Sequence, residues 1–304
     1  MKIVHSFDAV DKNEPLSLAF GYFDGIHLGH RKIIEENNKD LKNCVVTFDK
    51  HPMDLINKDK SPKMLMTMEE KEGYLEKMGV DYLFIIHFDS NFMNLTDRQF
   101  ISLVIDNVNM KKMKVGFNYH FGKNGRGNAD FLRKVSKEEG FELEVVDEYK
   151  IDDERVCSTA IRNLIYEGNI SKANKFLGRP YSITGKVVEG KHLGKQIGIP
   201  TANIFPDPVK AIPKRGVYVT RVTIDDEIYY GISNVGINPT FNEEPKVETN
   251  IFDFDGDIYG KEIKVEFLEF EREERAFESI DELKKTIEKS IKFGRDYIAH
   301  KLNY

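Results

Sequence analysis

The change of secondary-structure pattern near residue 180 constrains the fold of this chain more than any other feature. Before that point, stretches typical of strands alternate with stretches typical of helices, which predicts a parallel sheet with helices on both faces. After Pro180, short strand-like stretches follow one another without intervening helices, which favours an antiparallel barrel. We therefore expect an α/β domain over residues 1–179, and a small barrel with a C-terminal helix over residues 180–304.

Periodicity and turn residues predict the individual elements. In the first half, the expected strands are 16–20, 44–48, 81–88 and 114–117, and the expected helices are 30–40, 68–78, 97–108, 158–168 and 171–177. In the second half, the expected strands are 181–188, 216–224, 227–235, 248–254 and 262–270. A final amphipathic helix is expected after Ser279, which has capping-box spacing to Glu282.

Charge and cysteine content limit the kinds of partner. The chain holds 45 Lys and Arg against 51 Asp and Glu, and its net charge of −6 argues against non-specific binding to nucleic acid or to a membrane surface. No apolar run approaches the length needed to cross a bilayer, and the first residues lack a secretory apolar region. Because Cys44 and Cys157 are the only cysteines, we expect a reduced, cytoplasmic protein. We expect small-molecule partners and a monomer or weak homo-oligomer.

Residues 21–30, G-Y-F-D-G-I-H-L-G-H, join a buried strand to a helix. A helix N-terminus at the carboxyl edge of a parallel sheet presents free N–H groups, and glycine lets backbone approach a ligand closely. His27 and His30 can donate hydrogen bonds to phosphate oxygens and stabilise charge in a transition state. Since this turn holds no nucleophilic Ser or Cys, it predicts in-line attack on a phosphate. On these residues alone, a tight turn with two incidental histidines remains the alternative.

Other nucleotide-binding and metal-binding patterns do not occur in the sequence. Nothing matches the P-loop pattern G-x-x-x-x-G-K-[ST] or the dinucleotide-binding pattern G-x-G-x-x-G. The remaining histidines have no spacing that resembles a zinc site. Classical P-loop and dehydrogenase functions are therefore disfavoured.

Further blocks in a fixed order identify a family. Residues 46–52 (V-T-F-D-K-H-P) resemble a T-F-x-P-H-P block with Lys50 in place of its Pro, and residues 115–122 (V-G-F-N-Y-H-F-G) resemble a G-x-[DN]-[FY]-x-F-G block. Residues 157–162 (C-S-T-A-I-R) resemble an S-S-T-x-I-R block, and residues 190–203 fit G-x-x-x-G-x-x-x-G-x-P-T-A-N. Over essentially its whole length, the chain resembles the prokaryotic bifunctional riboflavin kinase/FMN adenylyltransferase family, or FAD synthetases.

This resemblance implies that the first domain is a Rossmann-like nucleotidyltransferase domain that adenylates FMN with ATP. His27 and His30 would be catalytic, and Asn118 would bind flavin. The implied ATP-binding residues are Gly21, Phe23, Asp24, Gly25, Ser158, Thr159 and Arg162. Two hydroxyls and a guanidinium at the start of a helix are physically a good anion site. His120 and Cys157 stand where the family commonly has Arg and Ser.

The resemblance implies that the second domain is a riboflavin kinase barrel. Gly190, Lys191, Gly194 and Lys195 would bind ATP. Thr201 and Asn203 would hold Mg²⁺ through oxygen, with Asn203 also at the flavin. Glu248 would be the catalytic carboxylate that orients the ribityl hydroxyl and accepts its proton. Glu243 and Glu244 are rivals on composition alone, and an ordinary glycine-rich barrel loop is the alternative for residues 190–203. Asn250 replaces the His expected two residues after Glu248.

Three other functions stay open beside flavin synthesis by both domains. The chain could be a riboflavin kinase with weak or lost adenylyltransferase activity, because His120 replaces an arginine. The first domain could adenylate a pantetheine or nicotinamide nucleotide, which the kinase-like second half disfavours. The chain could be a non-catalytic flavin-binding regulator. Retention of His27, His30, Thr201, Asn203 and Glu248 together disfavours a regulator, since binding alone needs no such set.

Overall fold

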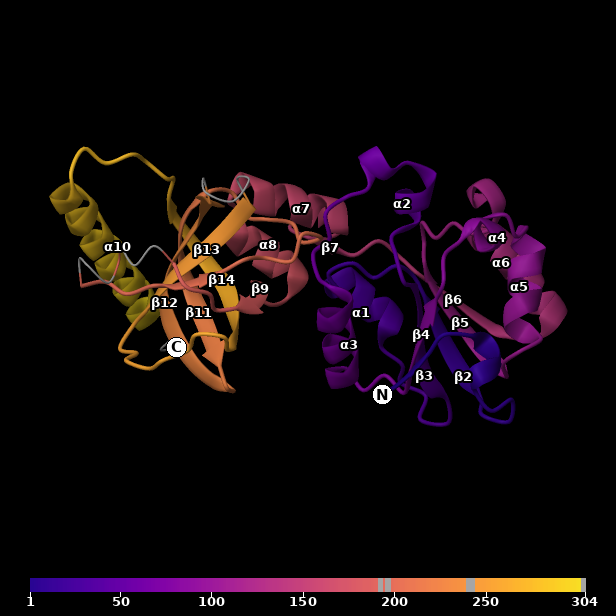
Figure 1. The fold of residues 1–304 in the computed structure, drawn as a ribbon. Coiled ribbons are helices and arrows are strands. Elements are labelled where there is room, and N and C mark those ends of the chain that lie inside the picture. The colour runs from indigo at the N-terminus through magenta and orange to yellow at the C-terminus, as the bar shows by residue number, and fades with distance from the viewer. Residues whose placement is uncertain (191–193, 195–197, 239–243, 302–304) are drawn as a thin grey trace. The chain divides into compact units, whose positions relative to one another are not determined.

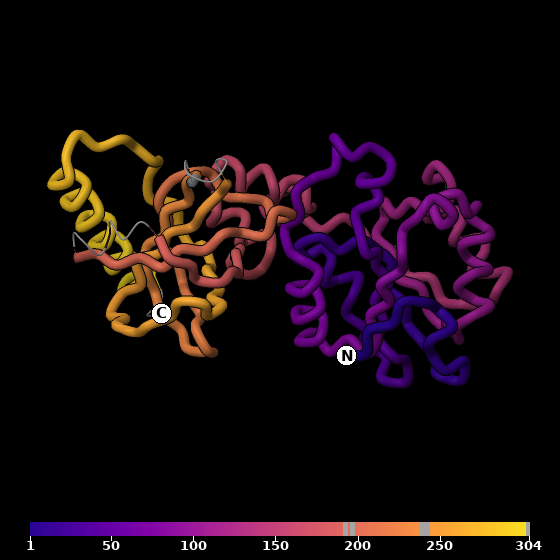
Figure 2. Tube along the Cα trace, in the orientation of Figure 1, coloured from indigo at the N-terminus to yellow at the C-terminus, as the bar shows by residue number. Residues whose placement is uncertain are grey.

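The computed structural model describes residues 1–190, 194, 198–238 and 244–301 (Figures 1 and 2). The chain forms two compact units, Met1–Ser158 and Thr159–Tyr304. The first unit contains a six-stranded parallel sheet, and the second contains a six-stranded antiparallel sheet. The expected combination of an α/β domain and a β domain is therefore confirmed.

The parallel sheet of the first unit has the strand order β1-β4-β3-β2-β5-β6. Its strands are β1 (Lys2–Val4), β2 (Leu16–Phe20), β3 (Lys42–Phe48), β4 (Tyr82–Ile86), β5 (Met110–Gly116) and β6 (Glu142–Val146). From β2 the chain first builds outward through β3 and β4, and later returns to pair β5 against the other side of β2. The reversal between β2 and β5 is a topological switch point, where open α/β sheets bind ligands at their carboxyl edge.

Helices cover both faces of this sheet (Figure 1). The α-helices of this unit are α1 (Leu28–Ile34), α2 (Pro52–Ile56), α3 (Met68–Lys77), α4 (Ser90–Met93), α5 (Asp97–Ile105) and α6 (Ala129–Glu139), and the short helices α2 and α4 bury none of their residues. All five residues of β2 are buried, and its neighbours Leu18 and Ala19 belong to different core clusters. A strand buried on both faces is typical of the centre of a parallel sheet.

Helix α1 differs from its predicted extent. It begins at Leu28 and ends at Ile34, whereas the periodicity predicted a helix over 30–40. The side chain of Glu36 accepts hydrogen bonds from the N–H groups of Asn37 and Asn38, both at 2.9 Å. These local bonds occupy amides that a longer helix would need for its own ladder, so the helix ends before them.

The second unit contains a curved antiparallel sheet with the order β10-β13-β12-β11-β14-β9. Its strands are β9 (Tyr181–Lys186), β10 (Ala202–Ile204), β11 (Gly216–Ile224), β12 (Glu227–Asn238), β13 (Glu244–Ile251) and β14 (Glu262–Arg272). An isolated bridge between Val188 and Asn203 links the segment after β9 to β10 at the opposite edge. The sheet thereby forms a small barrel, and α10 (Ile280–Lys301) packs its isoleucines against Val217, Ile232 and Phe252.

Helices α7 (Ser158–Glu167) and α8 (Ile170–Leu177) pack with the barrel unit. The side chain of Asn174 donates to the carbonyl of Phe267 at 2.7 Å and accepts from the N–H of Tyr181 at 2.7 Å, which ties α8 to β14 and β9. By packing, the boundary between the two units therefore lies between residues 158 and 159. The sequence motifs assign residues of α7 to the site of the first domain. The boundary at 179/180, which groups residues by function, therefore stays a prediction.

Candidate active sites

The turn formed by residues 21–30 leaves β2 at the switch point and is tightly constrained. The N–H of Gly21 donates to the carbonyl of Val46 at 3.1 Å, which ties the turn to β3. Phe23, Gly25 and Ile26 have φ values of 54°, 82° and 36°, and side chains other than glycine rarely adopt this region. The Phe23 ring is buried, and a Cβ added to Gly21 would lie 2.9 Å from it. Because its ring is buried, Phe23 leaves only its main chain for contact with a ligand.

The two predicted catalytic histidines lie together at the start of α1. His27 is the N-cap, and its Nδ1 accepts a hydrogen bond from the N–H of His30 at 3.2 Å. The two rings stack with centroids 3.6 Å apart. Because Nδ1 of His27 accepts, the proton of its neutral ring lies on Nε2, where it can be donated to a phosphate oxygen.

His30 is held neutral by its surroundings. Burial lowers its pKa well below the usual value, and the nearby His27 and Lys71 lower the pKa further. Its ring also meets the Phe23 ring edge to face at 5.3 Å. His30 can therefore act at neutral pH as a hydrogen-bond donor without carrying a charge.

Asp24 and Ser158, both predicted ATP-binding residues, connect the turn to distant parts of the first unit. One carboxylate oxygen of Asp24 accepts from the N–H of Leu65 at 2.8 Å. The hydroxyl of Ser158 donates to the carbonyl of Asp24 at 2.9 Å. Ser158 is the first residue of α7, and its hydroxyl holds the turn.

Asn118 follows β5, the strand that pairs with β2, and is exposed. Its amide oxygen lies 3.4 Å from the position that a Cβ on Gly116 would occupy. The turn and Asn118 thus lie at the carboxyl ends of neighbouring parallel strands.

His120 is exposed, and one ring nitrogen lies 3.0 Å from the carbonyl of Gly125. Thr159 and Arg162 belong to the second unit by packing, so their assignment to the first site stays a prediction.

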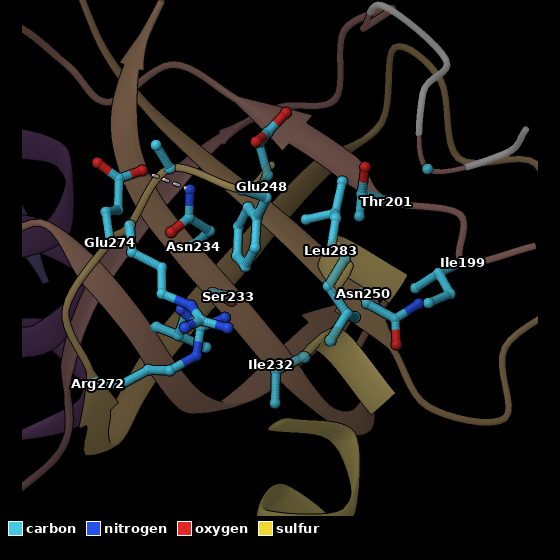
Figure 3. A pocket seen from close by; sticks show the side chains of 16 residues that line it. Ile199, Thr201, Ile232, Ser233, Asn234, Glu248, Asn250, Arg272, Glu274 and Leu283 are labelled. Atoms are coloured by element: carbon cyan, nitrogen blue, oxygen red, sulfur yellow. Dashed lines mark hydrogen bonds between the residues drawn. The ribbon is translucent and has the colours of Figure 1, made fainter. Parts of the chain in front are cut away.

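In the second unit, strand register aligns three polar residues. Glu248 on β13 pairs directly with Asn203 on β10 and with Asn234 on β12. Residues opposite each other in antiparallel strands project to the same face, so these side chains form one row. Glu248 and Asn234 of this row line a cavity of about 560 Å³, which Asn250 also lines (Figure 3).

Glu248 forms an ion pair with Lys246, and it lies away from Glu244, the other candidate carboxylate on β13. The ammonium of Lys246 lies 2.7 Å from its carboxylate. Glu244, the rival carboxylate, begins β13 and lies about 13 Å further along the strand at the usual rise per residue. Asn250 donates to the carbonyl of Pro200 at 2.8 Å, which holds the residue before Thr201 against β13.

The predicted magnesium ligands have an environment that fits a hard cation. The amide oxygen of Asn203 is buried and has no hydrogen-bond partner among the described residues, although its amide nitrogen donates to the Thr201 carbonyl at 3.3 Å. A Cβ on Gly190 would lie 2.6 Å from that nitrogen, and one on Gly194 would lie 2.4 Å from the Ile199 carbonyl. Neutral oxygens in a glycine-lined cradle suit Mg²⁺, which keeps several waters. Lys191, Lys195 and Glu243 lie outside the described residues.

Several cavity residues on β14, on α10 and in the segment between them were not predicted as site residues. Arg272 approaches the hydroxyl of Ser290 at 3.3 Å, Arg275 donates to Thr286 at 2.9 Å, and Glu274 accepts from Asn234 at 2.8 Å. Figure 3 shows Arg272, Glu274 and Leu283 around the same cavity as Glu248. The apolar stripe of the predicted C-terminal helix was the available signal, since Leu283 and Ile287 line the cavity.

Two family models match this chain: a model described as FAD synthetase matches residues 9–160, and one described as riboflavin kinase matches residues 177–298. A curated relative named bifunctional riboflavin kinase/FMN adenylyltransferase, from Bacillus subtilis, is 35% identical and covers 98% of both chains. The chain belongs to this family. Its relative of the same name from Escherichia coli is 33% identical over 98% of both chains.

One solved structure shares the fold of nearly the whole chain. A crystal structure from Streptococcus pneumoniae, reported as a macrolide-efflux protein, is 31% identical with a TM-score of 0.87. The match covers 97% of this chain and 98% of that one. Among the described residues of this chain, no helix is both long and apolar enough to span a bilayer.

Proposed function

We propose that this chain makes FAD from riboflavin in two ATP-dependent reactions, each at its own site. In the first, the terminal ribityl hydroxyl of riboflavin attacks the γ-phosphate of ATP, so that FMN forms and ADP leaves. In the second, a phosphate oxygen of FMN attacks the α-phosphate of another ATP, so that FAD forms and pyrophosphate leaves. The barrel unit would perform the first reaction, and the turn at residues 21–30 would serve the second.

One observation carries the kinase assignment: Thr201 and the residues beside it separate two cavities of the barrel unit. The cavity of about 560 Å³ holds Glu248 and apolar side chains of α10, which suits an aromatic flavin ring. A second cavity, of about 530 Å³, is lined by Pro200, Thr201, Asp255 and Tyr259. A flavin in the first cavity and a nucleotide in the second would meet at Thr201, where phosphoryl transfer would take place.

Glu248 would act at that meeting point as the base for the ribityl hydroxyl, while Lys246 holds its carboxylate. Thr201 and Asn203 would bind Mg²⁺, which when bound neutralises charge on the ATP phosphates. The unpartnered oxygen of Asn203 supports this assignment.

The adenylyl-transfer site relies on positioning and on hydrogen bonds. His27 and His30, whose pKa is lowered by burial, would donate to the phosphate oxygens on which charge develops as pyrophosphate leaves. Asn118 would position the flavin beside them. Gly21, Gly25, Phe23 and Asp24 would contact ATP through the backbone of the turn, with Ser158, Thr159 and Arg162 at the triphosphate.

The proposed partners are riboflavin, FMN and ATP. Acidic net charge and few cysteines support a cytoplasmic enzyme that binds no nucleic acid. A monomer or weak homo-oligomer is proposed as the working state.

The test is an assay of purified protein with riboflavin, ATP and Mg²⁺, in which products are separated by chromatography over time. We expect FMN to appear first and FAD to follow. FMN without FAD would contradict the bifunctional proposal and favour a kinase that has lost its transferase. No turnover would favour a flavin-binding regulator.

Gly190→Ala tests the magnesium cradle. The added methyl would collide with the Asn203 amide, so this side chain must move. Displacement of Asn203, a proposed magnesium ligand, is expected to slow FMN formation by about 10- to 100-fold and to raise the Mg²⁺ concentration needed for half-maximal rate. Adenylylation of supplied FMN should not change. Gly73→Ala is the matched control, because a methyl there meets no atom within 4 Å. An unchanged Mg²⁺ requirement in Gly190→Ala would argue against the cradle.

A further inference from the structure

Lys71 on α3 is a fully buried lysine beneath the turn at residues 21–30. Only 2% of this residue is exposed. Its ammonium donates to the carbonyl of Tyr22 at 2.6 Å and lies 3.4 Å from the hydroxyl of Thr47. The ammonium also lies 4.2 Å from the centre of the Tyr22 ring. Thr47 donates to the same Tyr22 carbonyl at 3.0 Å, so that α3, β3 and the turn meet at one oxygen.

Burial of this ammonium is unfavourable for folding. Desolvation lowers the pKa of Lys71 to about 8, and the charge of Asp24 only partly opposes that shift. The Tyr22 carbonyl would keep the Thr47 hydroxyl as a partner if Lys71 were apolar. An apolar side chain of similar length would fill the same space without the desolvation cost. Stability alone therefore does not explain a lysine at this position.

The charge acts on the residues that the adenylyl-transfer reaction uses. Tyr22 directly precedes Phe23, the first residue of the turn with positive φ, so a pinned Tyr22 carbonyl fixes where the turn begins. The charge of Lys71 interacts with the Asp24 carboxylate and with the imidazole of His30. The positive charge of Lys71 is one cause of the low pKa of His30.

We propose that Lys71 is a positioning residue of the adenylyl-transfer site, whose buried ammonium pins the Tyr22 carbonyl and thereby holds the turn and its two histidines in place for the phosphates of ATP. This inference rests on the proposed function of the first unit. Lys71 would not touch substrate, and it would act through Tyr22 and His30.

Three variants separate this role from a structural one. Lys71→Met removes the charge and both hydrogen bonds, and Lys71→Gln keeps a neutral donor. Lys114→Met is the matched control, because Lys114 is an equally buried lysine of the same unit that donates to the Glu35 carbonyl at the far end of α1. The readouts are kcat and KM for conversion of FMN to FAD from pH 6 to pH 10, and the thermal midpoint of unfolding.

In the Lys71→Met variant we expect kcat to fall by about tenfold or more, with a smaller change in KM for FMN and no loss of thermal stability. The ammonium is present below its pKa of about 8 and is lost above it. The wild-type rate should therefore fall as the pH rises through about 8, and Lys71→Met and Lys71→Gln should lack this decline. Lys71→Gln should retain more activity than Lys71→Met, and Lys114→Met should keep the decline.

Hydrogen exchange of the backbone amides in residues 21–30 provides a readout independent of catalysis. Loss of the hydrogen bond from Lys71 to the Tyr22 carbonyl should speed this exchange about tenfold in Lys71→Met, and the exchange should not change in Lys114→Met. A wild-type protein that makes no FAD would contradict the proposed function, while the exchange experiment would still test whether Lys71 holds the turn in place. Wild-type exchange in Lys71→Met would overturn the inference, as would a wild-type kcat and pH profile.

Discussion

Glu248→Gln should abolish most conversion of riboflavin to FMN, with kcat lower by about 10²- to 10⁴-fold. Glutamine keeps the size of the side chain and an oxygen that can still accept from Lys246, but it cannot take up the hydroxyl proton. The cross-strand contacts with Asn203 and Asn234 should persist, so the barrel should stay folded. Chromatographic measurement of FMN from riboflavin gives the kinase rate, and conversion of supplied FMN to FAD should match the wild type.

Glu244→Gln is the matched control for this substitution. Glu244 is exposed at the start of the same strand, so its loss should leave both reactions unchanged. Equal loss of kinase activity in the two variants would contradict the assignment of the base to Glu248.

His27→Asn should slow formation of FAD from FMN by about 10²- to 10³-fold, the typical effect of removing one preorganised donor from a transition state. Asparagine is a favoured N-cap residue, so this variant keeps the start of α1 while it removes the imidazole. The stacked partner His30 would also lose its neighbour at 3.6 Å. The measurement is the initial rate of FAD formation from FMN and ATP, with FMN formation from riboflavin as the internal reference.

His5→Asn provides the comparison for the loss of a histidine from the same unit. The ring of His5 lies 3.4 Å from the Ile85 carbonyl next to β1, and this residue has no assigned role. FAD formation at the wild-type rate in His27→Asn would show that this imidazole is not catalytic.

Local sequence signals predicted much of the fold because turn chemistry and burial agreed there. Strand β11 has the predicted bounds, since Asp225 and Asp226 adopt the positive φ values that a tight turn requires. The end predicted for α1 was wrong because the Glu36 side chain accepts hydrogen bonds from the following amides, which apolar periodicity does not report. Strand β10 was not predicted, since it has only three residues and pairs with distant β13.

Motifs predicted candidate reactive residues but not the residues that hold them in place. The contact of Asn250 with Pro200 joins residues 50 positions apart, and Arg272 lines the cavity beside Glu248 where β14 contacts α10. Lys71 lies in the polar run E-E-K-E, where a lysine normally faces solvent. Its burial follows from packing against the turn and Thr47, and no pattern in the sequence reports that packing.

The most direct test of two separate sites is one assay of both half-reactions on His27→Asn and Glu248→Gln, each verified as folded. His27→Asn supplied with riboflavin, ATP and Mg²⁺ should accumulate FMN without FAD. Glu248→Gln should convert supplied FMN to FAD at the wild-type rate and leave riboflavin unchanged. Loss of both half-reactions from either single substitution in a folded protein would contradict the two-site account.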